Sequence, residues 1–509
     1  MNEQELMLEQ IKLFEEQTDI KLQIKNGRPY YKGELYGVFS DYLPDNLVVD
    51  GSLDCFFTSN KLPNGLKVNG KLIICGTNIT EIPDDCEFKS LNISRTDIAK
   101  LRDNLMLDEL KMRRTSLTEL PRGLKVKGLL NISDTKITEI PDDCEFGSLD
   151  ISDTKIKKLR DNLTLDKLNV NLSDLIKLPR GLKVNGLLDI SETKITEIPN
   201  DCEFGSLKAC FTKITKLRDN LELDALIAYQ SSLSELPKGL KVKGVLNISH
   251  TKITEIPDDC EFGGLFMNGT KITKLRDNLT LGGLIIEKSS ITELPKNLVV
   301  YVVLNIKNTS IKCLPKDCLA TIVFCDFELK DERYNKNNKG YYKLKDEIVH
   351  IIHPSGREFL HVDGILSEVI EKKGNVYHVR NGVDEPITYV VTDNNNHWAH
   401  GDTLEEAKKD LRYKMSVRDK SEYEKLTLDS ELTFDEAVAC YRVITGACRA
   451  GTQDYLEHRL PEPVKEKYTI REIIDLTKDE YGGDTFREFF EKKISDNEYE
   501  RTRINIQTN

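Results

Sequence analysis

The chain has 509 residues, of which 39% are hydrophobic and 31% charged, and its net charge is −12. This is the composition of a soluble protein, and no run approaches the roughly 18 apolar residues that a membrane helix needs. The acidic balance argues against broad binding to the phosphate backbone of nucleic acids. The length allows several domains or one long solenoid.

Residues 1–42 are predicted to form an amphipathic helix and an N-terminal cap, since the end coil of a solenoid exposes its core. The opening stretch, MNEQELMLEQIKLFEEQ, is acidic and lacks the basic start and apolar run of a signal peptide. The 12 cysteines include a series at 58-residue intervals, and they show no spacing typical of disulfide frameworks or zinc sites. We therefore expect buried free thiols and a cytoplasmic location.

Residues 43–314 are built from units of 19 or 20 residues with the frame L-x-I-x-x-T-x-I-x-x-I/L-P/R. The L-x-I pair alternates like a short strand with both apolar side chains on its inner face. The threonine is expected to satisfy backbone groups where the chain turns out of the strand. A fixed period of about 20 residues predicts a solenoid.

The unit LPRGLKVKGLLNISDTKI, from Leu120 to Ile137, resembles the short bacterial leucine-rich repeat L-P-x-x-L-x-x-L-x-L-x-x-N-x-L, with threonine in place of the usual asparagine. The resemblance covers just over half of the chain. It implies an α/β solenoid with a parallel sheet on the concave face and extended segments on the convex face. It says little about function, because the family is a binding scaffold with many partners.

The residue before the closing Ile or Leu changes sign between units, as from Glu139 to Lys158. Equivalent side chains in stacked coils lie about 5 Å apart, so mixed signs avoid a ladder of like charges. We interpret this stripe as structural. The lysines that follow the threonines, such as Lys136, are interpreted as a solvated edge, and the alternative is a basic ridge for an acidic partner.

The positions that flank the buried L-x-I vary while the frame does not, and they are predicted to bind a protein. Exposed aromatic side chains beside mixed charges are typical of such surfaces. The alternative is drift on an unconstrained face. The predicted concave-face residues are Arg113, Arg114, Asp134, Asp153, Glu192, Phe211, Tyr229, Gln230, His250 and Phe266.

The composition changes after residue 314. Residues 315–415 are predicted to form a β-rich module that ends in a helix, and residues 416–509 a helical module. Thr403, Thr433 and Thr469 each stand where a helix cap is expected. Together these residues predict a smaller C-terminal α+β domain after the repeats.

Seven of the eight histidines fall in this C-terminal region, including His397 and His400. Their spacing matches no strong metal or catalytic motif, so we predict no metal, no cofactor and no catalytic residue. Cys440 and Cys448 fit one buried face of a helix. The alternative is that Cys448 is a nucleophile.

The segments HWAHGDTLEEAKKDLRYK and CYRVITGACRAGTQDYLE resemble uncharacterised proteins of phages and mobile elements in gut Firmicutes. That resemblance implies a context in which a large acidic binder blocks a host defence enzyme. The first hypothesis is therefore a non-enzymatic interaction scaffold, an anti-defence inhibitor that binds a protein such as a bacterial immune enzyme. The C-terminal module would supply a second contact or a homo-oligomer interface.

The alternative is an effector enzyme, because similar repeats precede a cysteine-dependent ubiquitin ligase domain. That family has a Cys-x-Asp motif, and the nearest approach here, around Cys325, lacks the spacing. Nucleic-acid binding by the lysine ridge conflicts with the charge balance.

Overall fold

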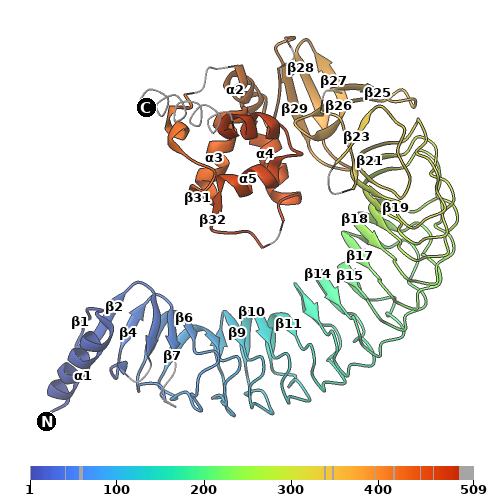
Figure 1. The fold of residues 1–509 in the computed structure, drawn as a ribbon. Helices are drawn as coiled ribbons and strands as arrows, with labels where there is room; N and C mark the ends of the chain where they lie inside the picture. The colour runs from blue at the N-terminus through green and yellow to red at the C-terminus, as the bar shows by residue number, and fades with distance from the viewer. Residues whose placement is uncertain are drawn as a thin grey trace, which may run out of the picture. The chain divides into compact units, whose positions relative to one another are not determined.

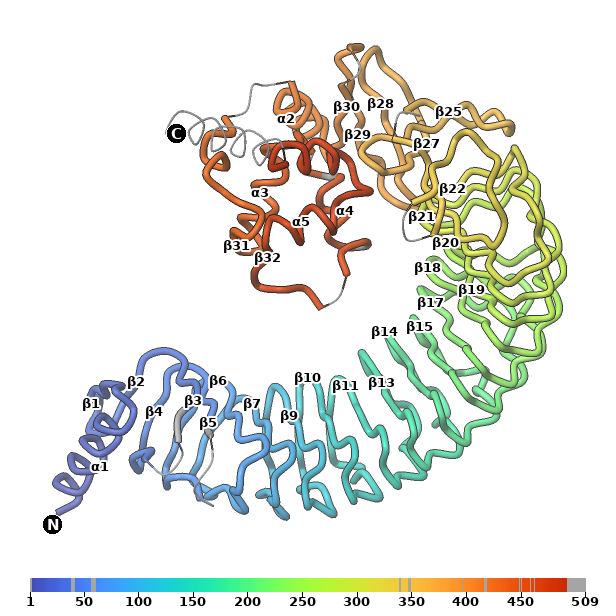
Figure 2. The backbone as a smooth tube through the Cα atoms, viewed as in Figure 1, coloured from blue at the N-terminus to red at the C-terminus, as the bar shows by residue number. Residues whose placement is uncertain are grey.

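The computed structural model describes residues 2–39, 42–56, 61–337, 340–346, 349–395, 397–415, 419–447, 449–461 and 463–491. The chain divides into two compact units, residues 1–261 and 262–509. Figure 1 labels their helices and strands, and Figure 2 traces the backbone. Of the described helices, none is long and apolar enough to cross a membrane.

The first unit opens with helix α1 (Glu3–Thr18), which a capping box at Asn2 begins and which buries Ile11 and Phe14. Strand β1 (Gln23–Lys25) pairs antiparallel with β2 (Arg28–Lys32), and Figure 1 shows both beside α1. Strand β2 in turn pairs parallel with β4 (Val48–Asp50). The parallel ladder therefore starts before residue 43, inside the segment predicted to be a cap.

Each following coil contributes a short strand or a pair of strand pieces, and Figure 2 shows the coils stacked. Leu130 of one coil lies opposite Leu149 of the next, and Leu149 lies opposite Leu168. This register places the same repeat position of every coil side by side, so the predicted parallel-sheet solenoid is confirmed. The remaining strands of this unit are β3 (Leu35–Phe39), β5 (Leu53–Phe56), β6 (Lys67–Ile73), β7 (Glu87–Asn92), β8 (Met106–Leu107), β9 (Glu109–Lys111), β10 (Lys125–Asn131), β11 (Glu145–Asp150), β12 (Thr164–Leu165), β13 (Leu168–Asn169), β14 (Lys183–Asp189), β15 (Glu203–Lys208), β16 (Glu222–Leu223), β17 (Ala225–Ile227) and β18 (Lys241–Asn247).

The repeated threonine has the backbone role that its position suggested. Leu130 and Ile132 are fully buried, and the Thr135 hydroxyl, also buried, donates to the Ile132 carbonyl at 2.7 Å. Thr154 makes the same bond at 2.7 Å, and Ser173 makes it at 2.6 Å. The hydroxyl satisfies a carbonyl at the point where the chain leaves the strand, which explains why Thr or Ser recurs there.

Carboxylates join neighbouring coils in the turns that precede the strands. Asp103 Oδ1 accepts from the Arg122 N–H at 3.0 Å, and Asp143 Oδ2 accepts from the Gly123 N–H at 2.8 Å. Gly123 has a φ of 61°, and an added Cβ would lie 2.5 Å from Asn104 Oδ1. Each bond joins one coil to the next, so these turns form coil-to-coil contacts.

The recurring cysteine and arginine belong to the same arrangement. Cys202 is buried, its thiol donates to the Pro179 carbonyl at 3.6 Å, and burial raises its pKa to about 11. Arg218 of the next coil lies over the Phe204 ring at 5.7 Å and donates to the Cys202 carbonyl at 2.6 Å. The arginine that stands in place of proline in some units therefore contacts the preceding coil through a ring and a carbonyl.

The stripe of alternating Glu and Lys forms few contacts. Among the ion pairs of the described residues, two join members of this stripe: Lys216 and Glu235 at 3.2 Å, and Lys61 and Glu81 at 3.8 Å. Lys194, one of the lysines that follow a threonine, pairs with Asp174 at 2.9 Å. These pairs are largely exposed, so each contributes little to stability.

In the second unit the ladder continues through β19 (Glu261–Phe266), β20 (Thr280–Ile285), β21 (Val299–Asn305) and β22 (Leu319–Phe324), all parallel. It therefore extends past residue 314. Strand β24 (Tyr342–Leu344) then pairs antiparallel with β22 and with β23 (Tyr334–Lys336). This hairpin covers the edge at which the parallel ladder ends.

A six-stranded antiparallel meander follows, with helix α2 (Leu404–Met415) packed on it through Ala407 and Leu411. Its contacts tie it to the last coils: Arg357 Nη1 donates to Thr280 Oγ1 at 2.7 Å, and His353 Nε2 lies 2.9 Å from the Asp317 carbonyl. The strands are β25 (His350–Ile352), β26 (Glu358–Val362), β27 (Ile365–Lys373), β28 (Val376–Arg380), β29 (Ile387–Thr392) and β30 (Trp398–Gly401).

The final region contains a 3-10 helix, η2 (Ser421–Lys425), the strand pair β31 (Glu431–Thr433) and β32 (Lys467–Thr469), and helices α3 (Phe434–Thr445), α4 (Arg449–His458) and α5 (Ile470–Thr477). Figure 1 shows these elements grouped together. Thr433 and Thr469 cap α3 and α5, as predicted. The second unit therefore carries the smaller sheet-and-helix region expected after the repeats.

Candidate functional site

Most of the predicted binding residues lie in turns at one edge of the parallel sheet. After β10 ends at Asn131, the chain passes the buried Ile132, and Asp134 adopts a φ of 56°. The expectation that such residues flank the L-x-I within the strand is corrected here, because the chain leaves the strand before it reaches them. This left-handed position, which we call the turn row, is occupied in consecutive coils by Arg95, Arg114, Asp134, Asp153, Leu172, Glu192, Phe211, Gln230 and His250.

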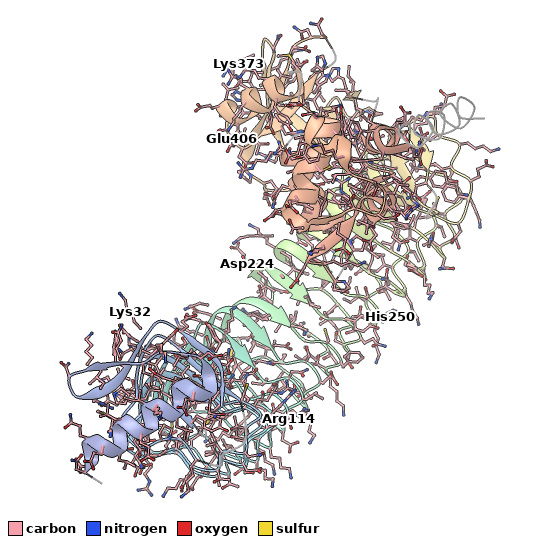
Figure 3. The ribbon with its side chains drawn as sticks, turned by 60° about the vertical axis from the view of Figure 1, so that its left-hand side comes forward. Lys32, Arg114, Asp224, His250, Lys373 and Glu406 are labelled. Carbon is pink, nitrogen blue, oxygen red and sulfur yellow. The ribbon has the colours of Figure 1, made fainter. Side chains whose placement is uncertain are left out.

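The turn row rests on a continuous ladder of backbone hydrogen bonds. Asp134 N donates to the Ser152 carbonyl at 2.9 Å, and Phe211 N donates to the Tyr229 carbonyl at 3.1 Å. Neighbouring positions of the row are therefore spaced like strands in a sheet, about 5 Å apart. Figure 3 labels Arg114 and His250 along one edge of the coils and Asp224 at the opposite edge.

Arginine and aspartate dominate the first part of this edge. Arg114 forms an ion pair with Asp134 of the next coil, and this hydrogen bond raises the pKa of Arg114. Arg113, directly before Arg114, is exposed, as are Arg95 and Asp153. Among the ion pairs of the described residues none involves Arg95, Arg113 or Asp153. These three charges are therefore available to a partner.

Aromatic rings occupy three consecutive coils further along. The ring centroids of Phe211 and Tyr229 are 5.4 Å apart with an interplanar angle of 80°, and those of Tyr229 and His250 are 5.5 Å apart at 90°. Both contacts are edge-to-face, the arrangement that the charge distribution of aromatic rings favours. The Phe211 side chain is 51% exposed. We call these three residues the aromatic ladder.

The polar residues at the ends of the strands are used within the protein. Asp150 accepts from the Ser152 N–H at 3.0 Å and from Asn131 Nδ2 at 3.2 Å. Asp189 is buried and pairs with Lys208 at 3.1 Å. These contacts shape the turn, so the adjacent strand positions are less free to bind than the turn row.

Phe266 differs from the other predicted residues. It is half-buried within β19, in the second unit, where it lies opposite Ile285 of the next coil. It belongs to the parallel sheet and has no place in the turn row.

Two exposed members of the turn row were missed by the sequence interpretation, Arg95 and Leu172. Leu172 is 50% exposed with a φ of 57°. The sequence did mark both residues, because each stands directly before the recurring Thr or Ser of its unit. Choosing that one position in every unit would have found both.

Three of the residues considered for catalysis, Cys325, His397 and His400, lie in the described parts of the chain. Cys325 is buried, and burial raises its pKa, so its thiol is not activated. His400 is fully enclosed, its pKa is lowered to about 4 by burial, and His397 pairs with Asp393 at 2.7 Å. Cys448 lies outside the described residues. In the described parts of the chain no three His, Cys, Asp or Glu side chains are placed to hold a metal ion.

No protein-family model matches the chain, and no curated protein matches it. Among solved structures, YopM from Yersinia enterocolitica WA-314 is similar to it over 64% of this chain and 83% of that chain, with 20% sequence identity and a TM-score of 0.39. The strand register described above shows a parallel-sheet solenoid, followed by a smaller C-terminal sheet-and-helix region.

Proposed function

We propose that the protein is a non-enzymatic scaffold that binds a partner protein through its turn row, with the aromatic ladder as the main anchor. The observation that carries this proposal is the edge-to-face stack of Phe211, Tyr229 and His250, in which Phe211 and His250 are exposed and Tyr229 is half-buried. Aromatic side chains dominate binding energy at protein interfaces, and an exposed cluster of them marks a contact surface.

The backbone under the ladder supports the same proposal. Phe211 N, Gln230 N and their equivalents donate to the next coil, so the side chains are presented from a fixed frame. A preformed surface loses little conformational freedom on binding, which leaves more of the contact energy as affinity.

The alternative, an effector enzyme, needs a reactive cysteine, and the raised pKa of Cys325 favours the scaffold. No disulfide joins the described cysteines, which favours the reducing cytoplasm as the place of action. The resemblance of two C-terminal segments to phage and mobile-element proteins makes a bacterial immune enzyme the first partner class to test, with inhibition as the consequence. A homo-oligomer through the C-terminal region is a further part of this proposal.

The experiment is capture from a bacterial lysate followed by mass spectrometry, with two baits that differ only at the ladder. The variant Phe211→Gly/Tyr229→Ser uses residues that the repeat already carries at these positions, since Gly76 and Ser133 are their equivalents. It therefore removes both rings without straining the turn.

Wild-type protein and the control Lys243→Ala, at the opposite edge of the sheet, are expected to capture the same protein. Lys243 is exposed and pairs with Asp224 at 3.0 Å. The ladder variant is expected to lose that protein. Equal capture by all three folded baits would contradict the proposal.

A further inference from the structure

The chemistry of the turn row is sorted along the coils. Arg95 and Arg113 form a basic section, Asp153 and Glu192 an acidic section with Leu172 between them, and the aromatic ladder an apolar section. Arg95, Asp153, Glu192, Phe211 and His250 belong to the turn row, and Arg113 and Tyr229 directly precede turn-row residues, so these side chains follow the same edge of the sheet along the coils. A row of basic, acidic and apolar sections can select a partner by the order of its side chains along the row, whereas a patch in which these side chains are mixed cannot.

Internal contacts separate the three sections. Arg114 and Asp134 neutralise each other at the junction of the basic and acidic sections. Lys208, the cation near the acidic section on the strand side, is held by Asp189 at 3.1 Å. The charges of Arg113, Asp153 and Glu192 are in no ion pair among the described residues. Their charges are therefore open to a complementary partner.

We propose that the partner contributes one extended peptide segment that crosses the coils and carries acidic, then basic, then large apolar side chains. This inference rests on the proposed function and adds the partner's chemistry to it. The acidic group would pair with Arg95 and Arg113, the basic group with Asp153 and Glu192, and the apolar group would cover Phe211 and Tyr229. Such complementarity sets specificity more than affinity.

The coil spacing fixes the dimensions of that segment. At about 4.8 Å per coil, Arg113 and Asp153 are about 10 Å apart, and Asp153 and Phe211 are about 14 Å apart. An extended chain rises about 3.3 Å per residue, so about three residues separate the acidic and basic groups and about four separate the basic and apolar groups. A segment of roughly 12 residues spans the row from Arg95 to His250, whereas a helix of 1.5 Å rise would need about twice as many.

The test uses a synthetic, fluorescently labelled 12-residue peptide with glutamates, lysines and a Trp-Leu pair at these spacings. A second peptide of identical composition has the glutamates and lysines exchanged. Anisotropy titrations of the full chain at low salt should show the first peptide binding at least tenfold more tightly than the second.

The matched variant is Arg113→Glu/Asp153→Lys, because Glu287 and Lys288 occupy these two positions in a later unit and Lys288 has a φ of 57°. This variant leaves one positive and one negative charge in each of the two sections, so it should abolish the preference between the two peptides. Equal binding of both peptides to wild type, binding of neither, or an unchanged preference in the variant would overturn the inference. The proposed function would survive that result if the Phe211→Gly/Tyr229→Ser bait still lost its captured protein, so the two can fail separately.

Discussion

The Tyr229 ring meets the Phe211 ring edge-to-face at a centroid distance of 5.4 Å, although the two residues belong to different coils. The contact exists because neighbouring coils lie about 5 Å apart, so that Tyr229, which directly precedes the turn-row residue of its own coil, reaches the turn-row residue Phe211 of the coil before it. The turn positions that vary between units therefore determine the chemistry of this edge, while the positions that recur in every unit build the core. The predictions below separate these two roles.

The buried threonine hydroxyl should be essential to coil stability. Thr135→Val keeps the shape of the side chain but leaves the Ile132 carbonyl without the donor that now lies 2.7 Å away. We expect a loss of about 1–2 kcal/mol in the free energy of unfolding, measured by urea denaturation. Thr138→Val, at an exposed position of the same coil, is the control and should change it by less than about 0.5 kcal/mol. Equal effects of the two variants would contradict this role.

Two glycines with positive φ should respond differently to alanine. Gly76 has a φ of 70° and nothing within 4 Å of an added Cβ, whereas a Cβ on Gly123 would lie 2.5 Å from Asn104 Oδ1. Gly76→Ala should therefore lower the free energy of unfolding by about 1 kcal/mol, from the strain of a left-handed backbone conformation alone. Gly123→Ala should cost more, because Asn104 or the coil must also move. Thermal unfolding of both variants measures the difference, and a smaller loss for Gly123→Ala would refute the account.

The second unit should lose stability in acid through His400. Burial lowers the pKa of His400 to about 4, below the ordinary value of 6.5, so the folded state keeps this ring neutral. The unfolded chain takes up a proton below pH 6.5, and stability should fall as the pH drops from 6.5 to about 4, by at most about 3 kcal/mol. Below pH 4 the folded state is protonated too, and this contribution levels off.

The variant His400→Gln should remove that contribution and flatten the pH dependence of unfolding between pH 6.5 and 4. Circular dichroism during denaturant titration at several pH values measures it. His397→Gln, which changes an exposed histidine paired with Asp393, is the control and should keep the wild-type profile. Matching profiles for His400→Gln and wild type would show that the buried ring does not govern acid stability.

Cysteine reactivity bears on the enzyme alternative. Cys313 is exposed, whereas Cys202 and Cys325 are buried with raised pKa values. Brief treatment of the folded chain with iodoacetamide at pH 8 should label Cys313 and spare the other two, as mass spectrometry of peptides can show. Rapid labelling of Cys325 would instead favour a nucleophilic thiol.

Much of the solenoid could be predicted, because the same short sequence pattern recurs in every unit and determines the structure of each coil. The Thr135 and Thr154 bonds follow from a residue whose hydroxyl can reach a carbonyl three positions back. The position of the predicted binding residues within each coil was harder to predict than the coil itself. Whether Asp134 ends a strand or begins a turn depends on its φ angle, and the amino-acid sequence alone does not distinguish these two conformations.

The C-terminal region was harder still, since its key contacts join distant parts of the chain. Lys414 of α2 pairs with Asp363, between β26 and β27, at 2.6 Å, and Arg459 pairs with Glu480 at 2.7 Å. Capping boxes are local and could be recognised, whereas these buried pairs depend on tertiary packing that no local pattern encodes. The order of strands in the meander could not be predicted either, because this region contains no sequence repeat.

The most direct test of the central claim is the affinity of the captured partner for two variants of the same turn position. Isothermal titration calorimetry should show Phe211→Gly weakening binding by about 30-fold, or roughly 2 kcal/mol, as loss of an aromatic anchor does. Leu172→Gly, which removes an exposed side chain from the same left-handed position outside the ladder, should weaken binding less than threefold. An unchanged affinity for Phe211→Gly would contradict the claim that the aromatic ladder binds the partner.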